Sequence, residues 1–402
     1  MNSNFPNYAE RMDNLNASAI REILKLAAGG DIISFAGGLP SPESFPLDDI
    51  NKAIAEVMKN EGPQALQYCS TEGHPGLREK LIKRMAEHNG IKGQTLENVI
   101  LVNGSQQGLD LAGKIFLNKG DVVFVEEPTY LAAINAFKAY QATVIGVPTD
   151  DDGIIPEELE KMLQKYPNAK LLYVIPDFQN PTGKTMTYER RKGLIEVVNK
   201  YPIIVLEDNP YGELRYTGEM VPSIKTLDTM DKVVYMCTFS KVLAPGFRLG
   251  WMTGKKEIIT KIAVAKQATD LQSGTFAQHV CNKYLEMFDL DEHIAEVLKI
   301  YGHRRAVMLE ALEKEMPEGV SWVVPEGGLF LWLRLPEGLD AGEALQECIK
   351  NHVAYVPGAP FFASEKTAQV NTARFNFSFV DDDTLRKGVK ACADTFRKIL
   401  NK

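Results

Sequence analysis

The chain has 402 residues, of which 45% are hydrophobic and 24% charged, a composition typical of a soluble globular protein with one or two substantial cores. Its formal net charge of −8 argues against a nucleic acid or an anionic membrane as the main partner. The five cysteines have no CxxC spacing, the charged N-terminal segment is unlike a signal peptide, and no apolar run reaches the ~18 residues of a membrane span, so we expect a cytoplasmic protein without a metal site.

The N-terminal part predicts a helix from about Ser18 to Ala27, then the turn-rich segment AGGLPSPESFP and a helix from about Leu47 to Lys59. From about residue 96 to 255, short apolar runs alternate with helical patterns, which indicates an α/β layer with a mostly parallel sheet. Several runs are apolar at every position, as in strands covered on both faces. The predicted strands are Val99 to Val102, Val122 to Val125, Thr143 to Val147, Leu171 to Ile175, Ile203 to Leu206, Val233 to Met236 and Leu249 to Met252.

The C-terminal part predicts a smaller α+β region. Long helices are expected at about Glu257 to Gln272 and Asp291 to Glu315, with a last helix from about Asp382. The strands expected between them are Phe330 to Leu335, Val353 to Val356 and Arg374 to Phe379. We therefore divide the chain into an N-terminal arm and helix (1–45), a large domain (46–285) and a small domain (286–402).

Polar residues follow five of the predicted strands, where an open α/β sheet binds its ligands. After Val99 to Val102, the segment GSQQGLD places the backbone N–H groups of Ser105 and Gln106 at a helix start, where they can bind an anion. An ordinary N-cap by Ser105 explains the same pattern. After Val122 to Val125, Tyr130 of EEPTY can stack on a flat aromatic ligand or simply belong to the core.

The next two strand ends carry an amide and a carboxylate. Asn180 of FQNPTG precedes a proline that fixes where its amide points, although turn chemistry alone accounts for NPTG. Asp208 and Tyr211 lie in EDNPYGEL. A carboxylate at a sheet edge needs a partner, and a protonated ring nitrogen of a ligand would be one; the alternative is that Asp208 caps a helix.

The segment TFSKVLAPGFRLGW supplies a lysine among apolar neighbours, Lys241, together with two anion-binding groups, Ser240 and Arg248. A desolvated amine is a nucleophile toward an aldehyde, whereas a surface loop with two solvated cations is the simpler interpretation of this segment alone. The five strand ends together favour a ligand that is a phosphorylated aromatic aldehyde with a ring nitrogen. Pyridoxal 5′-phosphate is such a molecule.

Each group then has a role in holding that cofactor. Lys241 binds the aldehyde and later carries the substrate proton, and Asp208 keeps the ring nitrogen protonated. Tyr211 and Asn180 hydrogen-bond the ring oxygen. The phosphate is expected to be bound by Ser105, Gln106, Ser240 and Arg248.

These motifs give the chain a resemblance to the fold type I pyridoxal-phosphate aminotransferases of class I/II, over nearly its whole length. Further segments that carry it are FAGGLPSPESFP, LQYCSTEGHPGLRE, PEGGLFLW, YVPGAPFF and ARFNFSF, and SAIREILKL places it nearest the 2-aminoadipate and kynurenine aminotransferase branch. The resemblance implies an aspartate-aminotransferase-like fold with a seven-stranded sheet. It also implies transamination between an L-amino acid and a 2-oxo acid such as 2-oxoglutarate, by a homodimer with shared sites.

The resemblance adds residues that the strand ends do not reveal. Tyr68 matches a tyrosine that reaches the cofactor phosphate of the neighbouring subunit, and Arg374 matches the arginine that grips the substrate carboxylate. Arg21 matches an arginine on a mobile helix that contacts the substrate side chain, and Gly38 falls among the substrate-binding positions. Thr238 stands where the family has a small hydroxyl residue near the phosphate, with an added methyl group.

Two questions stay open at this level. A β-lyase or decarboxylase would use the same cofactor groups, and a ligand-sensing domain derived from a transcriptional regulator would keep the fold. The donor is also open, because Arg21 suits an acidic side chain, whereas an apolar lining would suit branched or aromatic donors. The residues considered for that lining are Leu15, Ile20, Phe35 and Leu39.

Overall fold

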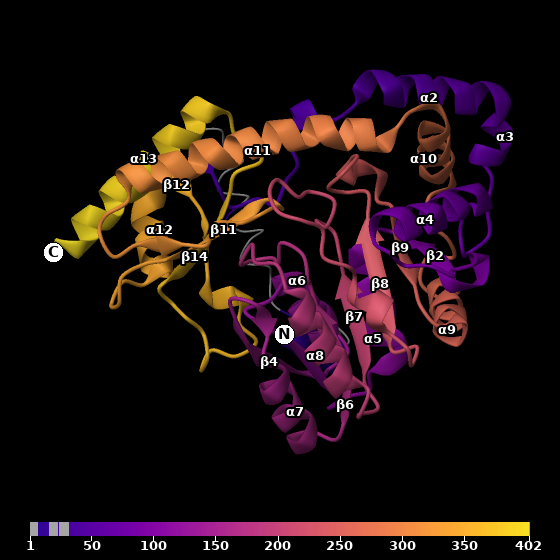
Figure 1. Ribbon diagram of the computed structural model, residues 1–402, viewed down its shortest axis with the longest axis horizontal. Coiled ribbons are helices and arrows are strands. Elements are labelled where there is room, and N and C mark those ends of the chain that lie inside the picture. The colour runs from indigo at the N-terminus through magenta and orange to yellow at the C-terminus, as the bar shows by residue number, and fades with distance from the viewer. Residues whose placement is uncertain (1–6, 16–22, 24–31, 402) are drawn as a thin grey trace.

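The computed structural model describes residues 7–15, 23 and 32–401, and its two main sheets lie in different parts of the molecule (Figure 1). The larger sheet has the strand order β2-β9-β8-β7-β6-β3-β4-β5. Its strands are β2 (Val99–Val102), β3 (Val122–Glu127), β4 (Thr143–Asp150), β5 (Gly153–Ile154), β6 (Ala169–Val174), β7 (Ile204–Asp208), β8 (Val233–Thr238) and β9 (Gly250–Thr253). This confirms the α/β class.

The large sheet is mostly parallel, as predicted. The exceptions are β9, which is antiparallel to both β2 and β8, and the edge strand β5, which is antiparallel to β4. All seven predicted strands are present. The strand that the sequence did not predict, β5, has two residues, too few for a hydrophobic period to be recognised.

The alternation of side chains explains why the central strands are apolar throughout. In β3, Val123 and Val125 join one hydrophobic cluster with α5 (Ser105–Phe116) and α6 (Leu131–Lys138), whereas Val122 and Phe124 join another with α7 (Pro156–Lys165) and α8 (Tyr188–Val198). Successive side chains of a strand point to opposite faces, so both faces of the sheet are covered by helices. With both faces covered, the carboxyl edge of the sheet is where a ligand can bind.

Several helices form the flank beside β2 and β9 in Figure 1. They are α2 (Leu47–Asn60), α3 (Gly62–Ala65), α4 (Pro75–His88), α9 (Lys256–Gln267) and α10 (Thr275–Met287). Helix α9 ends five residues before its predicted limit. The N–H groups of Thr269, Asp270 and Leu271 all point to the carbonyl oxygen of Lys266, and Leu271 has a φ of 67°, so the chain turns there.

The smaller sheet is antiparallel, with the order β10-β11-β14-β13. Its strands are β10 (Ser321–Trp322), β11 (Phe330–Arg334), β13 (Val356–Pro357) and β14 (Thr372–Asn376). The predicted strand from Val353 to Val356 is in fact divided, because its first part, β12 (Val353–Ala354), pairs in parallel with β1 (Ile33–Ser34). This pairing attaches the N-terminal segment to the C-terminal region.

Three helices accompany the small sheet: α11 (Leu290–Glu315), α12 (Ala341–Lys350) and α13 (Asp382–Leu400). Helix α11 runs from the large sheet's side of the molecule to the small one and lies beside α13 (Figure 1). The predicted helix from Ser18 to Ala27 lies, apart from Ile23, outside the described residues. The division of the chain at residues 45 and 285 stays a prediction.

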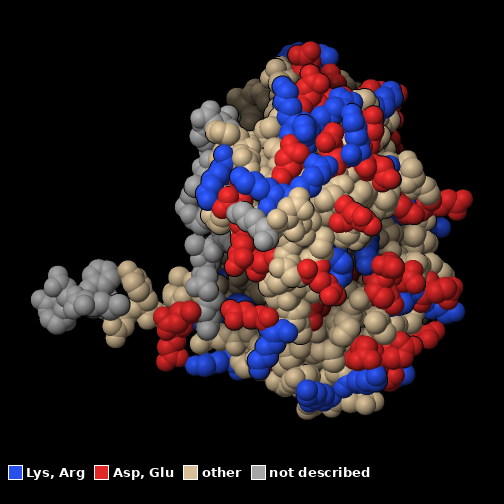
Figure 2. All heavy atoms as spheres, turned by 90° about the vertical axis from the view of Figure 1, so that its left-hand side faces the viewer, with Lys and Arg blue, Asp and Glu red and all other residues tan. Residues whose placement is uncertain are grey.

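Among the described residues, no helix is both long and apolar enough to cross a lipid bilayer. Figure 2 shows the face on the left of Figure 1, where acidic and basic side chains are interspersed.

Candidate active site

A cavity of about 310 Å³ opens at the carboxyl edge of the large sheet. Residues from β11 and β14 of the small sheet and from the segment after β1 complete its wall. The lining residues are Gly38, Ser105, Gln106, Tyr130, Leu131, Ala132, Ile175, Asn180, Asp208, Pro210, Tyr211, Thr238, Ser240, Lys241, Pro245, Arg248, Phe330 and Arg374. The structure thus brings together every predicted site residue except Tyr68 and Arg21.

Lys241 lies just beyond β8 with its amine at the cavity wall. Its Nζ donates a 2.8 Å hydrogen bond to the carbonyl oxygen of Gly38. Burial lowers the pKa of the Lys241 amine to about 8, and the positive charges of Arg374 and Arg248 act in the same direction. Near neutral pH a useful fraction of this amine is therefore unprotonated, as a nucleophile or a proton acceptor requires.

Asp208 is the last residue of β7 and is 2% exposed. The hydroxyl of Tyr173, on the neighbouring strand β6, donates to its Oδ2 over 2.9 Å. Within the described chain Oδ1 has no hydrogen-bond partner. Burial raises the pKa of Asp208 to about 6, and the hydroxyl groups of Tyr173 and Ser105 oppose that rise. A buried carboxylate oxygen without a donor fits a ligand that brings its own N–H group.

Tyr173 is a site residue that the sequence analysis missed. It lies in the middle of LLYV, a strand that is otherwise apolar. A tyrosine whose hydroxyl is buried needs a hydrogen-bond partner, and that requirement is the signal that could have directed attention to it.

An anion cradle forms where β2 leads into α5. Gly104 has a φ of 71°, which favours glycine, and a Cβ atom at this position would lie 2.6 Å from Nη2 of Arg248, so a side chain here would displace the guanidinium. The N-terminus of α5, with Ser105 and Gln106, opens toward the same side of the cavity. Backbone N–H groups at a helix start and a guanidinium are the groups that bind a phosphate.

Thr238 shapes the other side of this cradle. Its Oγ1 lies 2.8 Å from Oγ of Ser240 and accepts the Ser240 backbone N–H over 3.1 Å. Thr238 therefore fixes the position of Ser240 and also lines the cavity itself.

Arg374, on β14, is 2% exposed and faces the large sheet across the cavity. Its Nη1 donates to Oδ1 of Asn180 over 2.8 Å and its Nη2 to the carbonyl oxygen of Ala36 over 2.6 Å. The guanidinium lies 4.2 Å from the ring centroid of Phe330, which the sequence analysis did not select. Burial lowers the pKa of Arg374 to about 10, and its Nε lacks a partner among the described residues. The side chain is oriented as a fixed cation that can receive a carboxylate.

Two tyrosines complete the wall. Tyr211 is buried and meets the Phe330 ring edge to face, with 5.8 Å between centroids. Burial raises the pKa of Tyr211, and a side-chain hydrogen bond with Asn180 opposes that rise. Burial also raises the pKa of Tyr130. Both phenols stay protonated at neutral pH and can donate hydrogen bonds to a ligand in the cavity.

The remaining predicted residues lie elsewhere. Tyr68 is 77% exposed on the surface of this chain, and Arg21 and Ile20 lie outside the described residues. The expectation that Phe35 lines an apolar substrate pocket is wrong, because Phe35 is not among the residues that line the cavity and its ring stacks on Phe375 in the core. Leu39 is 45% exposed and is not among the residues that line the cavity.

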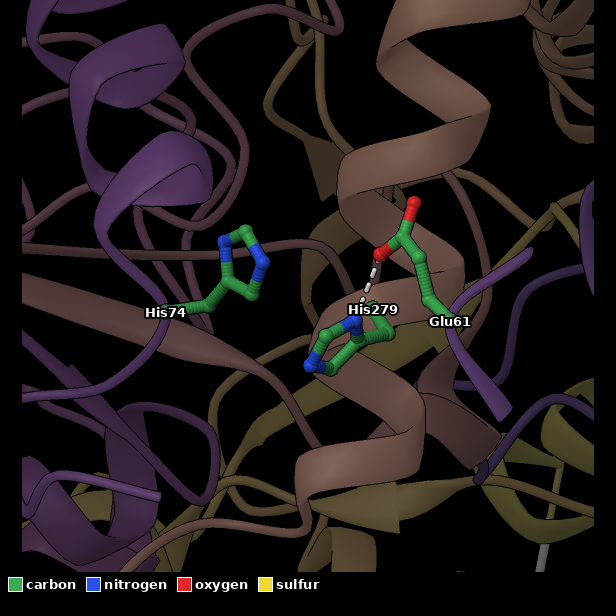
Figure 3. Close-up of side chains that lie close together, drawn as sticks. All are labelled: Glu61, His74 and His279. Atoms are coloured by element: carbon green, nitrogen blue, oxygen red, sulfur yellow. Dashed lines mark hydrogen bonds and ion pairs between the residues drawn. The ribbon is translucent and has the colours of Figure 1, made fainter. Parts of the chain in front are cut away.

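A second group of polar side chains lies away from the cavity. Glu61, His74 and His279 come from three segments and approach one another (Figure 3), with potential ligand atoms within 4.8 Å. His74 Nδ1 accepts the Leu77 N–H, which leaves the proton of a neutral ring on Nε2, and Glu61 is shared between His279 and Lys283. Metal binding would require His74 to give up this helix cap, so we assign no metal site here.

Comparison with known proteins agrees with this geometry. The sequence model of the family described as aminotransferase class I and II matches residues 31–391. The chain is 45% identical to aromatic-amino-acid aminotransferase 1 of Thermococcus litoralis, over 98% of this chain and 95% of that protein.

Two solved structures are similar to the whole chain. The kynurenine aminotransferase of Pyrococcus horikoshii superimposes with a TM-score of 0.93 at 47% identity, covering 98% of this chain and 97% of that one. The α-aminoadipate aminotransferase LysN of Thermus thermophilus, complexed with N-(5'-phosphopyridoxyl)-L-leucine, gives a TM-score of 0.90 at 34% identity, with 98% of each chain covered.

Proposed function

The chain belongs to the class I and II aminotransferases, which use pyridoxal 5′-phosphate, and we propose that it transfers the amino group of aromatic and dicarboxylic L-amino acids to 2-oxoglutarate. One observation carries this proposal. The amine of Lys241, the carboxylate of Asp208 and the guanidinium of Arg374 converge on one cavity of about 310 Å³ from three different strands or strand ends.

The residues present fit the cofactor. Asp208 Oδ1 is a buried acceptor without a donor among the described residues, as a protonated ring nitrogen requires. The cradle of Gly104, Ser105 and Arg248 suits the phosphate, and Tyr130 and Ile175 provide flat and apolar surfaces for a ring. When bound, pyridoxal 5′-phosphate supplies an aldehyde that reacts with amines and a protonated ring that accepts electrons.

The protein's own contribution is binding, orientation and proton transfer. Lys241 Nζ, with a pKa of about 8, can accept a proton near neutral pH and return it to a neighbouring carbon. Arg374 binds the α-carboxylate of the substrate and so fixes which bond faces Lys241. Its position is set before substrate arrives by the bonds to Asn180 and Ala36.

The relatives support the proposed donor range. The similar proteins named above act, by their names, on aromatic amino acids, kynurenine and α-aminoadipate. We assign to Arg21 the recognition of the acidic side chain of dicarboxylic donors. An Arg21→Ala variant should therefore show a larger rise in KM for 2-aminoadipate than for leucine or phenylalanine. Equal changes for all donors would contradict that role.

We also propose that the enzyme is a cytoplasmic homodimer in which Tyr68 serves the neighbouring site. Tyr68 is 77% exposed, and Leu66, two residues before it, is 69% exposed. The Cys69 N–H donates to Gln272 over 2.7 Å. This bond brings in Leu271, which is 49% exposed. Such neighbouring exposed apolar residues support a subunit contact. The cysteines of the structure are all free thiols, which supports a reducing compartment.

The decisive experiment follows the cofactor spectrum while a panel of L-amino acids is added without any 2-oxo acid. Amino donors should convert the bound cofactor to its amine form, and later addition of 2-oxoglutarate should restore the spectrum and yield glutamate. Release of pyruvate and ammonia without a 2-oxo acid would identify a β-lyase instead, and release of carbon dioxide a decarboxylase.

A further inference from the structure

A single carboxylate outside the cavity holds both ends of the anion cradle. Oδ2 of Asp270 accepts hydrogen bonds from Nδ2 of Asn103 over 2.5 Å and from Nε2 of Gln107 over 2.6 Å. Asn103 comes immediately before Gly104, and Gln107 comes immediately after Gln106. Asp270 thus bridges the two residues that flank the segment of the cradle.

Lys266 closes this network. Its ammonium lies 3.0 Å from both oxygens of Asp270 and 2.8 Å from Oε1 of Gln107. The same Oε1 of Gln107 also accepts the backbone N–H of Asn103 over 2.8 Å. The side chain of Lys266 is fully buried, and that of Asp270 is 24% exposed. Because the two charges of the pair cancel, the Asp270 carboxylate can lie near an anion site without a net negative charge.

The cradle also needs support from outside its own segment, because it contains a glycine. Gly104, with a φ of 71°, has no side chain to restrict its backbone. From the cavity side, Nη2 of Arg248 reaches the carbonyl oxygen of Asn103 over 3.2 Å. Asn103 is therefore fixed by Arg248 on one side and by Asp270 on the other. Backbone donors bind an anion well only when they are already oriented toward it.

We propose that Asp270 is a positioning residue for the cofactor phosphate: it does not touch the cofactor, but it holds Asn103 and Gln107 so that the N–H groups of Ser105 and Gln106 converge. This inference rests on the proposed function. It assigns to a turn at the end of α9 a role in cofactor affinity that is separate from the chemical step.

The competing explanation is purely structural, namely that the Lys266–Asp270 pair only ends α9. The two explanations predict different effects on ligands with and without a phosphate. A clamp on the phosphate cradle matters for pyridoxal 5′-phosphate but not for pyridoxal, which has the same ring and aldehyde and no phosphate. A structural role affects both ligands alike, together with the stability of the apoenzyme.

The test titrates apoenzyme with each ligand and follows the visible absorbance of the lysine adduct. Asp270→Asn leaves one side-chain oxygen to accept from Asn103, Gln107 and Lys266, replaces the other with a donor and removes the negative charge that holds Lys266, so the clamp is weakened. We expect the Kd for pyridoxal 5′-phosphate to rise about tenfold or more, with the Kd for pyridoxal unchanged. The kcat at saturating cofactor should stay within about twofold of wild type.

The matched control is Asp228→Asn. Asp228 forms another buried ion pair within one turn, with Lys225 at 2.7 Å, and is not among the residues that line the cavity. It should lower the thermal stability of the apoenzyme and leave the ratio of the two Kd values unchanged. If Asp270→Asn does not fold, Asn103→Ala removes one end of the clamp, keeps the Lys266–Asp270 pair and should show the same loss confined to the phosphorylated ligand.

Equal rises in both Kd values, or none, would overturn the positioning role. The wild-type titration separates this result from a failure of the proposed function. If wild-type apoenzyme formed no adduct with pyridoxal 5′-phosphate, the assigned function itself would be wrong, whereas a normal wild-type titration with an unselective Asp270→Asn effect would refute only the role of Asp270.

Discussion

The Nζ atom of Lys241 lies 2.8 Å from the carbonyl oxygen of Gly38, which belongs to the segment that leads from β1 across the cavity. The amine that we assign to catalysis is thus oriented by a backbone carbonyl of the N-terminal part, 203 residues away along the chain. A neutral amine keeps such a bond as a donor and still offers its lone pair to a ligand. The contact therefore orients Lys241 without blocking it.

Replacing Lys241 tests the whole assignment. In Lys241→Ala we expect loss of the visible absorbance that cofactor gives with a lysine amine, and loss of turnover with every donor, since neither nucleophile nor proton carrier remains. Absorbance titration and glutamate formation measure the two effects. Activity retained in this variant would refute the mechanism.

Removing the Tyr173 hydroxyl should change the pH at which apoenzyme takes up cofactor. The pKa of Asp208 is about 6, and the Tyr173 hydrogen bond lowers it, so Tyr173→Phe should raise it. Because the carboxylate form is needed to hold a protonated ring nitrogen, the acidic midpoint of cofactor association should move to higher pH. Stopped-flow association across pH 5 to 8 measures the midpoint.

A suitable control for this variant is Tyr284→Phe. Tyr284 is a buried tyrosine on α10 and is not among the residues that line the cavity. Its removal should leave the midpoint where it is. A midpoint that moves downward in Tyr173→Phe would mean that the hydroxyl does not stabilise the carboxylate.

Binding of the substrate carboxylate should depend on the shape of the Arg374 side chain as well as on its charge. Arg374→Lys keeps a cation but loses the planar fork and the bonds to Asn180 and Ala36. We expect kcat/KM to fall about 100-fold for all donors, which corresponds to about 3 kcal/mol. Arg304→Lys, a buried arginine that is not among the cavity-lining residues, is the control. A loss restricted to one donor class would show that Arg374 contacts the side chain instead.

The site residues at the strand ends were predictable because hydrophobic runs mark the strands and parallel strands end at one edge of the sheet. Parallel strands place their carboxyl ends on one edge, so Asp208 and Lys241 could be grouped from hydrophobic runs and the polar residues after them. Tyr173 and Asp270 could not be grouped in this way. One lies inside a strand and the other after a helix, and their contacts depend on lateral packing that no sequence period records. Phe35 was misassigned for the same reason, since it lies just after β1 with its ring stacked on Phe375 in the core.

The buried amine should also leave a signature in the stability of the apoenzyme. The pKa of Lys241 is about 8 in the folded protein and its usual value is 10.5. Between these pH values the unfolded chain holds the proton that the folded chain has lost, so stability rises with pH in this window. Lys241→Met removes the cost of burying the charge, so its advantage over wild type should be largest below pH 8 and shrink up to pH 10.5. Urea unfolding at several pH values measures it, and an advantage that does not vary with pH would contradict the lowered pKa.

Shared active sites predict that two defective variants can complement each other. If Tyr68 serves the neighbouring site, Tyr68→Ala should weaken cofactor binding, whereas Lys241→Ala abolishes turnover within its own subunit. In a mixed dimer, one site then contains Lys241 from the first variant and Tyr68 from the second, both intact.

Mixing the two defective preparations after mild dissociation should therefore restore turnover at limiting cofactor, up to half the wild-type turnover for each mixed dimer, because one of its two sites is intact. Mass spectrometry of the intact assembly gives the fraction of mixed dimers independently. Mixing Lys241→Ala with Lys241→Met is the control, because no combination of these two subunits contains an intact lysine. If mixed dimers form and turnover does not return, Tyr68 acts within its own subunit or does not contact the cofactor, and the exposed surface around Leu66 and Leu271 then needs another explanation.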